Sequence, residues 1–149
     1  WKTGWACGPA PLIAAVRTAK QFLTFVGGAP FQPAVAHALA EENDWVEALR
    51  TDLQRRRDVL SLALRDAGFG VKHSAGTYFV CVDIEPLGET DADAFCRALP
   101  ERIGVVAVPV DAFVDHRESW STLVRFAFCK QDEVLQDGAR RLASLRRAD

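Results

Sequence analysis

The sequence contains no methionine, and it begins at Trp1. Because an open reading frame starts with methionine, we expect this chain to be an internal or C-terminal piece of a longer protein. Long apolar runs are also absent: stretches such as 78–82 and 105–110 fall far below the roughly 18 residues that a membrane-spanning helix needs. The sequence therefore predicts neither a membrane segment nor a signal peptide.

An excess of charge of either sign is missing as well. The 18 lysines and arginines nearly balance the 20 aspartates and glutamates, the net charge is -2, and no basic stripe runs along the chain. This balance argues against a nucleic acid or an anionic membrane surface as a partner. A hydrophobic content of 49% over 149 residues is instead ordinary for a soluble protein with one real core.

Patterns typical of disulfides and metal sites are lacking too. The chain has four cysteines, with no CxxC among them, and 3 histidines that show no metal-ligand spacing. We interpret the cysteines as reduced core residues of a cytoplasmic protein, and we predict no metal site. The residues concerned are Cys7, Cys81, Cys96 and Cys129, together with His37, His73 and His116.

The first part of the chain reads as a strand followed by helices. Residues 1–7 favour a strand that has lost its beginning, and an apolar stripe at helical spacing then predicts a helix to about Phe22. Paired glycines and a proline in residues 24–30 predict a loop of fixed shape, and a short helix is expected at 31–40. A strand that feeds helices in this way is typical of the edge of an α/β domain.

From Asp44 onward the pattern is different. Asp44 is expected to cap a long helix that ends at Gly68, after which the apolar period changes from 3.6 residues to 2. Thr90 and Asp132 are expected to cap two further helices, the first of which stops at Pro100. The expected strands are 69–73, 78–84, 105–110 and 123–129.

Two domains follow from these patterns. We predict that residues 1–43 are the C-terminal part of a larger α/β domain whose remainder is missing. Residues 44–149 form a small α+β domain in which helices cover one face of a mostly antiparallel sheet.

The stretch 123–130, LVRFAFCK, sets one arginine inside an apolar strand. Alternation places Val124, Phe126 and Phe128 on one face of this strand and Arg125 on the other. A guanidinium is always charged and costly to desolvate alone, so Arg125 needs a carboxylate or phosphate partner. From the strand alone, that partner is a ligand, a structural Asp or Glu, or plain solvent.

Three motifs read together suggest a family. WKTGW opens the chain, GTYFVCVD lies in the middle, and VAVPVDAF followed by LVRFAFCK lies near the end. In this order they resemble the class I/II aminotransferases of fold type I, which depend on pyridoxal 5'-phosphate. Within that family the chain is most similar to the branch that contains kynurenine and glutamine transaminases and N-succinyldiaminopimelate aminotransferases. The implied overall fold is α/β.

The resemblance also implies roles for individual residues. The Schiff-base lysine of the family lies upstream of the stretch that begins here at Trp1, so no catalytic lysine is expected in this chain. Lys2 matches the cation that contacts the cofactor phosphate, and Arg125 matches the arginine that holds the substrate α-carboxylate. Phe25 matches an aromatic that reaches into the neighbouring subunit's site, and Tyr78 lies in a segment near the substrate pocket; core packing stays an open alternative for both.

The function that the resemblance implies is transamination between an amino acid and a 2-oxo acid, with N-succinyl-LL-diaminopimelate and 2-oxoglutarate as one substrate pair. The alternatives are a kynurenine or glutamine transaminase, a cysteine-conjugate β-lyase, and a non-catalytic α+β interaction module. A cytoplasmic homodimer is implied for the whole enzyme. We predict that this piece is inactive alone, because it lacks the Schiff-base lysine.

Overall fold

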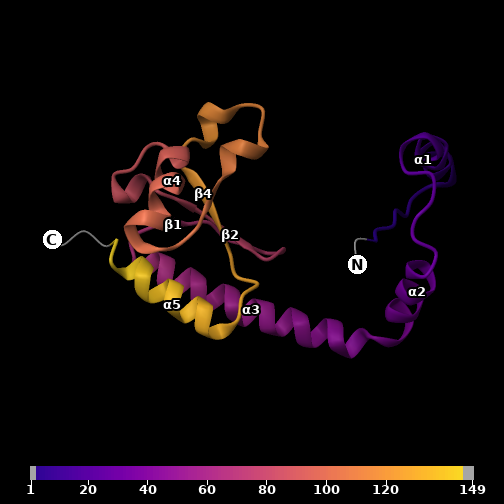
Figure 1. Cartoon of the computed structure of the whole chain (residues 1–149), viewed down its shortest axis with the longest axis horizontal. Coiled ribbons are helices and arrows are strands. Elements are labelled where there is room, and N and C mark those ends of the chain that lie inside the picture. Colours follow the sequence, from indigo (N-terminus) through magenta and orange to yellow (C-terminus); the bar gives the residue numbers. More distant parts are fainter. Residues whose placement is uncertain (1–2, 146–149) are drawn as a thin grey trace. The chain divides into compact units, whose positions relative to one another are not determined.

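The computed structural model of the chain describes residues 3–145. The fold divides into two compact units, one up to Leu49 and the other from Arg50 onward. No helix among the described residues combines the length and the hydropathy needed to cross a membrane. The cartoon in Figure 1 labels the main helices and strands of both units.

The first unit contains α1 (Ala10–Leu23), α2 (Phe31–Glu41) and the start of α3 (Asn43–Asp66). Both expected short helices and the loop between them are confirmed. The strand expected at 1–7 is wrong for residues 3–7, which form no regular structure and pair with no strand. Trp1 and Lys2 lie outside the described residues. Neither α1 nor α2 buries a residue, so this unit has no core of its own among the described residues.

The second unit is built on a four-stranded sheet with the order β1-β2-β4-β3, and every neighbouring pair is antiparallel. This confirms the expected small antiparallel sheet. All four strands are shorter than expected, and β1 and β3 have only two residues each. The strands are β1 (Gly70–Val71), β2 (Phe79–Asp83), β3 (Val108–Pro109) and β4 (Leu123–Ala127).

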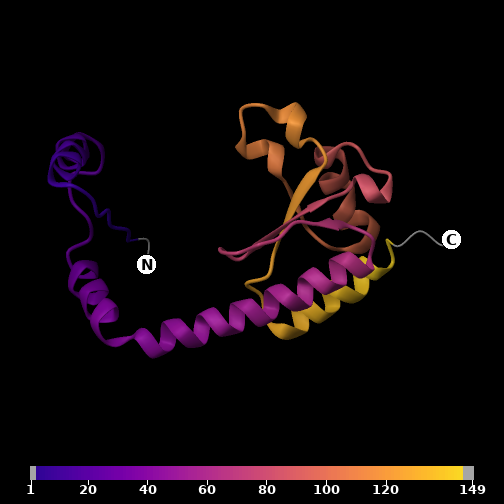
Figure 2. The same ribbon diagram turned by 180° about the vertical axis from the view of Figure 1, so that it is seen from behind.

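Two helices and three short 3-10 turns complete this unit. They are α4 (Ala92–Ile103), α5 (Asp132–Ala143), and the turns η1 (Glu85–Leu87), η2 (Val110–Phe113) and η3 (Arg117–Trp120). Figures 1 and 2 show α5 lying beside α3 on the same side of the sheet. The connection between β3 and β4 consists mostly of the two 3-10 turns η2 and η3.

Alternation in β2 and β4 gives the sheet two different faces. We call the first the helix face; its residues are Val80, Val82, Val124 and Phe126, all at most 3% exposed. Buried leucines of α3, α4 and α5 pack on it, which confirms that helices cover one face. The second, which we call the arginine face, carries the half-buried side chains Phe79, Cys81, Asp83, Leu123, Arg125 and Ala127.

Several helix ends differ from the expected ones. Because α3 begins at Asn43, Asp44 lies in its first turn and does not cap it. The cap of α4 is Asp91 and not Thr90, since the Asp91 carboxylate accepts the N–H of Ala94 at 2.9 Å. Pro100 does not end that helix either. A proline in the last turn removes only one backbone hydrogen bond, and the helix continues to Gly104, whose φ of 70° ends it.

Asp132 stands inside the first turn of α5, and Gln131 precedes it as the N-cap. The Asp132 carboxylate accepts a hydrogen bond from the Arg55 Nη2 of α3 at 2.8 Å and does not cap its own helix. Asp52 accepts the same nitrogen at 2.7 Å. This small network ties the beginning of α5 to the middle of α3.

The prediction that all four cysteines are core residues is wrong for three of them. All four are free thiols, but only Cys96 is buried; Cys81 is half-buried, and Cys7 and Cys129 are exposed. Cys7 is the last residue of the segment that forms no strand, and Cys129 lies two residues beyond the end of β4, so neither is held against the core.

Candidate functional site

Arg125 occupies the middle of β4, which is an interior strand of the sheet. It pairs with Cys81 of β2 on one side and with Val108 of β3 on the other. Its neighbours in sequence, Val124 and Phe126, point into the core on the helix face. The backbone of Arg125 is therefore fixed by two strands, and its side chain projects from the arginine face.

Two aromatic rings enclose the guanidinium of Arg125. Its Cζ atom lies 4.3 Å from the centroid of the Phe79 ring and 4.0 Å from that of Phe113. Phe79 belongs to β2, and Phe113 ends the 3-10 turn η2. Both distances are well inside the range in which a cation is attracted to the face of a ring.

Among the described residues, the guanidinium of Arg125 has a buried nitrogen without a hydrogen-bond partner. Its Nε atom is buried and makes no hydrogen bond, and within residues 3–145 no carboxylate forms an ion pair with it. Arg55 and Arg57 of α3, in contrast, each bind an aspartate at 2.7 Å. A partly desolvated guanidinium without a partner is costly, and a bound oxyanion would offset this cost.

Tyr78 contacts Phe79, which is one of the two rings beside the Arg125 guanidinium. Its ring centroid is 4.5 Å from that of Phe79, with the ring planes tilted by 47°. Its carbonyl accepts the N–H of Phe128 at 3.0 Å, which holds the start of β2 against the end of β4. The side chain is 47% exposed, so Tyr78 does not fill the core. Tyr78 and Arg125 thus both contact the ring of Phe79.

Phe25 and Lys2 belong to the other part of the chain, and Lys2 lies outside the described residues. The Phe25 side chain is 79% exposed, so it does not plug a core within this chain. Its φ of 57° is unusual for a bulky residue. The expected role of Phe25 stays a prediction, as does that of Lys2.

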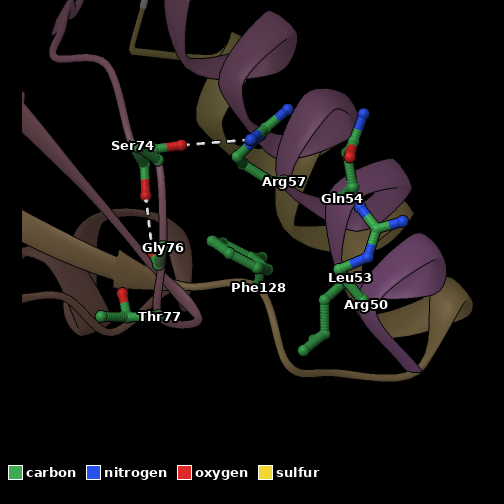
Figure 3. A pocket seen from close by; sticks show the side chains of 9 residues that line it. Arg50, Leu53, Gln54, Arg57, Ser74, Gly76, Thr77 and Phe128 are labelled. Carbon is green, nitrogen blue, oxygen red and sulfur yellow. Dashed lines mark hydrogen bonds between the residues drawn. The ribbon is translucent and has the colours of Figure 1, made fainter. Parts of the chain in front are cut away.

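A cavity of about 260 Å³ lies between α3 and the loop before β2, and Figure 3 shows its lining. The Arg57 Nη1 donates to the Ser74 carbonyl at 3.1 Å (Figure 3). The Ser74 hydroxyl has one proton to donate, and two carbonyls lie within hydrogen-bond distance, that of Gly76 at 3.0 Å and that of Phe79 at 2.8 Å. Phe128, from the helix face, forms part of the wall. Arg125 is not among the residues that line this cavity.

Two ionisable groups near the sheet have shifted pKa values. Burial acts to raise the pKa of Asp83, but hydrogen bonds from the Glu85 N–H and the Thr122 hydroxyl, with the charge of Lys72, bring its pKa below the usual 3.8. Burial raises the pKa of the Cys96 thiol to about 11. Cys96 is therefore an inert core thiol, and Asp83 is a structural carboxylate at the end of β2.

Phe79 and Phe113 contact Arg125, but neither was predicted from the sequence as its partner. The alternation of 78–84 places Phe79 on the face opposite Val80 and Val82, so its position on the arginine face could have been found. Phe113 ends the motif VAVPVDAF, but only the 3-10 turn shows that its ring returns to β4. No group of three His, Cys, Asp or Glu side chains within residues 3–145 could hold a metal ion.

The profile of the family "Aminotransferase class I and II" matches residues 1–142 of this chain. The chain belongs to this aminotransferase family. It is 55% identical over 153 aligned positions to the probable N-succinyldiaminopimelate aminotransferase of Mycobacterium tuberculosis, covering 97% of this chain and 38% of that protein. It is 34% identical to the methionine aminotransferase of Escherichia coli, with 97% and 37% covered.

The comparison with solved structures agrees with the sequence comparison. The structure of N-succinyldiaminopimelate aminotransferase from Mycobacterium tuberculosis superposes with a TM-score of 0.89 at 58% identity, covering 97% of this chain and 38% of the other. The fold is therefore that of the fold type I aminotransferases, as the motifs predicted. The chain spans well under half the length of the relatives it matches.

Proposed function

We propose that the gene product containing this chain transfers an amino group from an amino acid to a 2-oxo acid, with pyridoxal 5'-phosphate as cofactor. The observation that carries the proposal is the Arg125 guanidinium, which is held between two rings with a buried Nε and no carboxylate partner among residues 3–145. A substrate α-carboxylate supplies the missing oxyanion, and the planar fork of an arginine suits its two oxygens.

The residues of this chain fit one side of such a site. Arg125 would hold the substrate carboxylate, and the ammonium of Lys2 is a suitable partner for the cofactor phosphate. When bound, pyridoxal phosphate supplies the electron sink for the bond cleavage at the substrate Cα. The Schiff-base lysine is expected upstream of Trp1, so we expect this piece to be inactive alone.

The part played by Arg125 is orientation. Two parallel hydrogen bonds would fix the position and plane of the carboxylate; with the amino group held at a second point, the direction of the substrate Cα–H bond would also be set. Because β2 and β3 both pair with β4 at Arg125, the clamp rests on rigid backbone. Tyr78 would line the same pocket, and Phe25, which is exposed in this chain, would reach the site of a second subunit in a homodimer.

We propose the substrate pair N-succinyl-LL-diaminopimelate and 2-oxoglutarate. The support is the 55% identity to the relative from Mycobacterium tuberculosis, against 34% to the methionine aminotransferase. We further propose that residues 44–149 form the small domain of the whole enzyme, that residues 1–43 belong to the cofactor-binding domain, and that the enzyme is cytoplasmic.

The test uses the complete gene product loaded with pyridoxal phosphate. Glutamate formation from 2-oxoglutarate is measured with N-succinyl-LL-diaminopimelate, methionine, kynurenine, glutamine and a cysteine conjugate as donors. We expect the highest kcat/KM for the succinylated donor. A higher kcat/KM for another donor would contradict the proposed substrate but support transamination. Release of pyruvate from the cysteine conjugate without glutamate formation would favour a β-lyase. Turnover of none of the donors would contradict the proposal.

A further inference from the structure

The surroundings of Arg125 carry an inference that rests on the proposed function and deepens it. We propose that Phe113 and Phe79 are positioning residues: their rings hold the Arg125 guanidinium in one plane, so that it binds a carboxylate end-on through its two Nη atoms. The rings themselves do not touch the reacting atoms.

The geometry at the guanidinium supports the end-on direction. A guanidinium can bind a carboxylate side-on, through Nε and one Nη, or end-on, through both Nη atoms. The Nε of Arg125 is inaccessible even to water and has no hydrogen-bond partner. With a ring at 4.3 Å and another at 4.0 Å from Cζ, only the Nη end is left for a ligand.

Phe79 is held in place by the loop that precedes it. The Ser74 hydroxyl donates to the Phe79 carbonyl at 2.8 Å, and the Phe79 N–H donates to the Thr77 hydroxyl at 3.2 Å. Arg57 of α3 fixes the loop through the Ser74 carbonyl, as Figure 3 shows. Thr77 keeps a φ of 63°, a strained value for a β-branched residue. The loop thus links α3 to the ring under Arg125.

Phe113 lies in the turn η2 and not in the sheet, so it is a better residue to change than Phe79. It follows Pro109, whose φ of -68° leads into the turn η2, and its side chain is 59% exposed. Within this chain, truncating it opens no cavity in the core, and the Tm measurement below separates a change in ligand binding from a loss of stability in the complete gene product. Leu62 of α3, which is 58% exposed and lies on another element, offers a control of equal exposure.

The experiment compares Phe113→Leu, Phe113→Tyr, Leu62→Ala and Arg125→Ala in the complete, cofactor-loaded gene product. The dissociation constant of 2-oxoglutarate is measured by titration calorimetry, and KM, kcat and Tm are measured beside it. Loss of one cation–π contact predicts a rise of about 2- to 30-fold in the dissociation constant and KM for Phe113→Leu, with kcat nearly unchanged. Phe113→Tyr, which keeps the ring, should stay close to wild type, and Tm should not fall by more than it does in Leu62→Ala.

A second readout tests the direction of binding. In protein labelled with ¹⁵N-arginine, the Nε–H resonance of Arg125, identified by its loss in Arg125→Ala, should be shifted upfield by the two rings. Addition of 2-oxoglutarate should move the Nη resonances more than the Nε resonance.

The outcomes separate the two proposals. Binding that survives Arg125→Ala unchanged would overturn the proposed clamp itself. Binding that is lost in Arg125→Ala but is the same in Phe113→Leu as in wild type would overturn only the positioning role of the ring. An Nε resonance that moves most on addition of 2-oxoglutarate would replace end-on binding by side-on binding.

Discussion

Replacing Arg125 by lysine keeps the positive charge and removes the fork. A lysine ammonium makes one strong bond to a carboxylate where the guanidinium makes two in parallel. A hydrogen bond to a charged group contributes about 1.5–3 kcal/mol, so kcat/KM for an α-amino acid should fall about 10- to 150-fold. The structure favours the upper part of this range, because a planar group fills the space between rings at 4.3 and 4.0 Å and a round ammonium does not.

The assay is steady-state transamination by the complete gene product, with the amino donor varied at saturating 2-oxoglutarate. Arg102→Lys is a matched control. Its guanidinium also lies over a ring, 5.7 Å from the centroid of Phe95, but it is paired with Glu89 at 2.8 Å on a different element. We expect kcat/KM of this variant within about twofold of wild type, because a surface ion pair contributes little.

A second comparison tests whether the effect of the substitution depends on the α-carboxylate of the substrate. An amine that lacks the α-carboxylate cannot use the fork, so wild type and Arg125→Lys should process it at similar, low rates. If Arg125→Lys lowers kcat/KM less than threefold for amino acids, or lowers it equally for the amine, the carboxylate role of Arg125 is wrong.

Three further predictions concern the sheet and its core. Phe69 is 4% exposed and meets the rings of two phenylalanines edge-on at 5.8 and 6.1 Å, so Phe69→Ala should lower the free energy of unfolding by about 3–5 kcal/mol in a urea titration. Because the folded pKa of Asp83 is lowered, its carboxylate stabilises the fold above pH 3.8 and loses this effect as the pH falls through the folded pKa. Asp83→Asn should therefore lower Tm at pH 7, and the difference from wild type should shrink below pH 3.8; a difference independent of pH would contradict this. Burial and a pKa of about 11 should keep Cys96 unreactive at pH 8, while an aromatic disulfide reagent modifies the exposed Cys129 rapidly.

The faces of the central strands were predictable from the sequence. Alternation alone places Val124 and Phe126 in the core and Arg125 opposite to them, and the structure has them so. The apolar stripe of α5 was predictable for the same reason, since Leu135 and Leu142 recur at helical spacing and both are buried. Strong periodicity over several residues leaves only one arrangement that buries the apolar side.

Local signals at element ends were less reliable. Pro100 predicts a helix end, but the helix continues because a last-turn proline is tolerated when the C-cap is a glycine with positive φ. The strand expected at 105–110 shrinks to two residues, since Pro109 cannot donate to the ladder and turns the chain into η2. These outcomes depend on a balance of small energies that no single residue decides.

The ring contacts of Arg125 could not be predicted from the sequence, for a different reason. Phe113 lies twelve residues before Arg125, and no periodicity links a 3-10 turn to a strand across that distance. The need of Arg125 for an oxyanion follows from its chemistry, whereas the rings that orient it follow only from the path of the loop.

One measurement tests the central claim most directly: the visible absorbance of the complete gene product, purified with pyridoxal phosphate and titrated with N-succinyl-LL-diaminopimelate. We predict a cofactor band that shifts as the donor is added in wild type. In Arg125→Ala, which loses both hydrogen bonds and the charge, the same shift should need a donor concentration at least about a hundredfold higher. A colourless protein that takes up no pyridoxal phosphate, or a band that shifts at the same donor concentration in both proteins, would contradict the account.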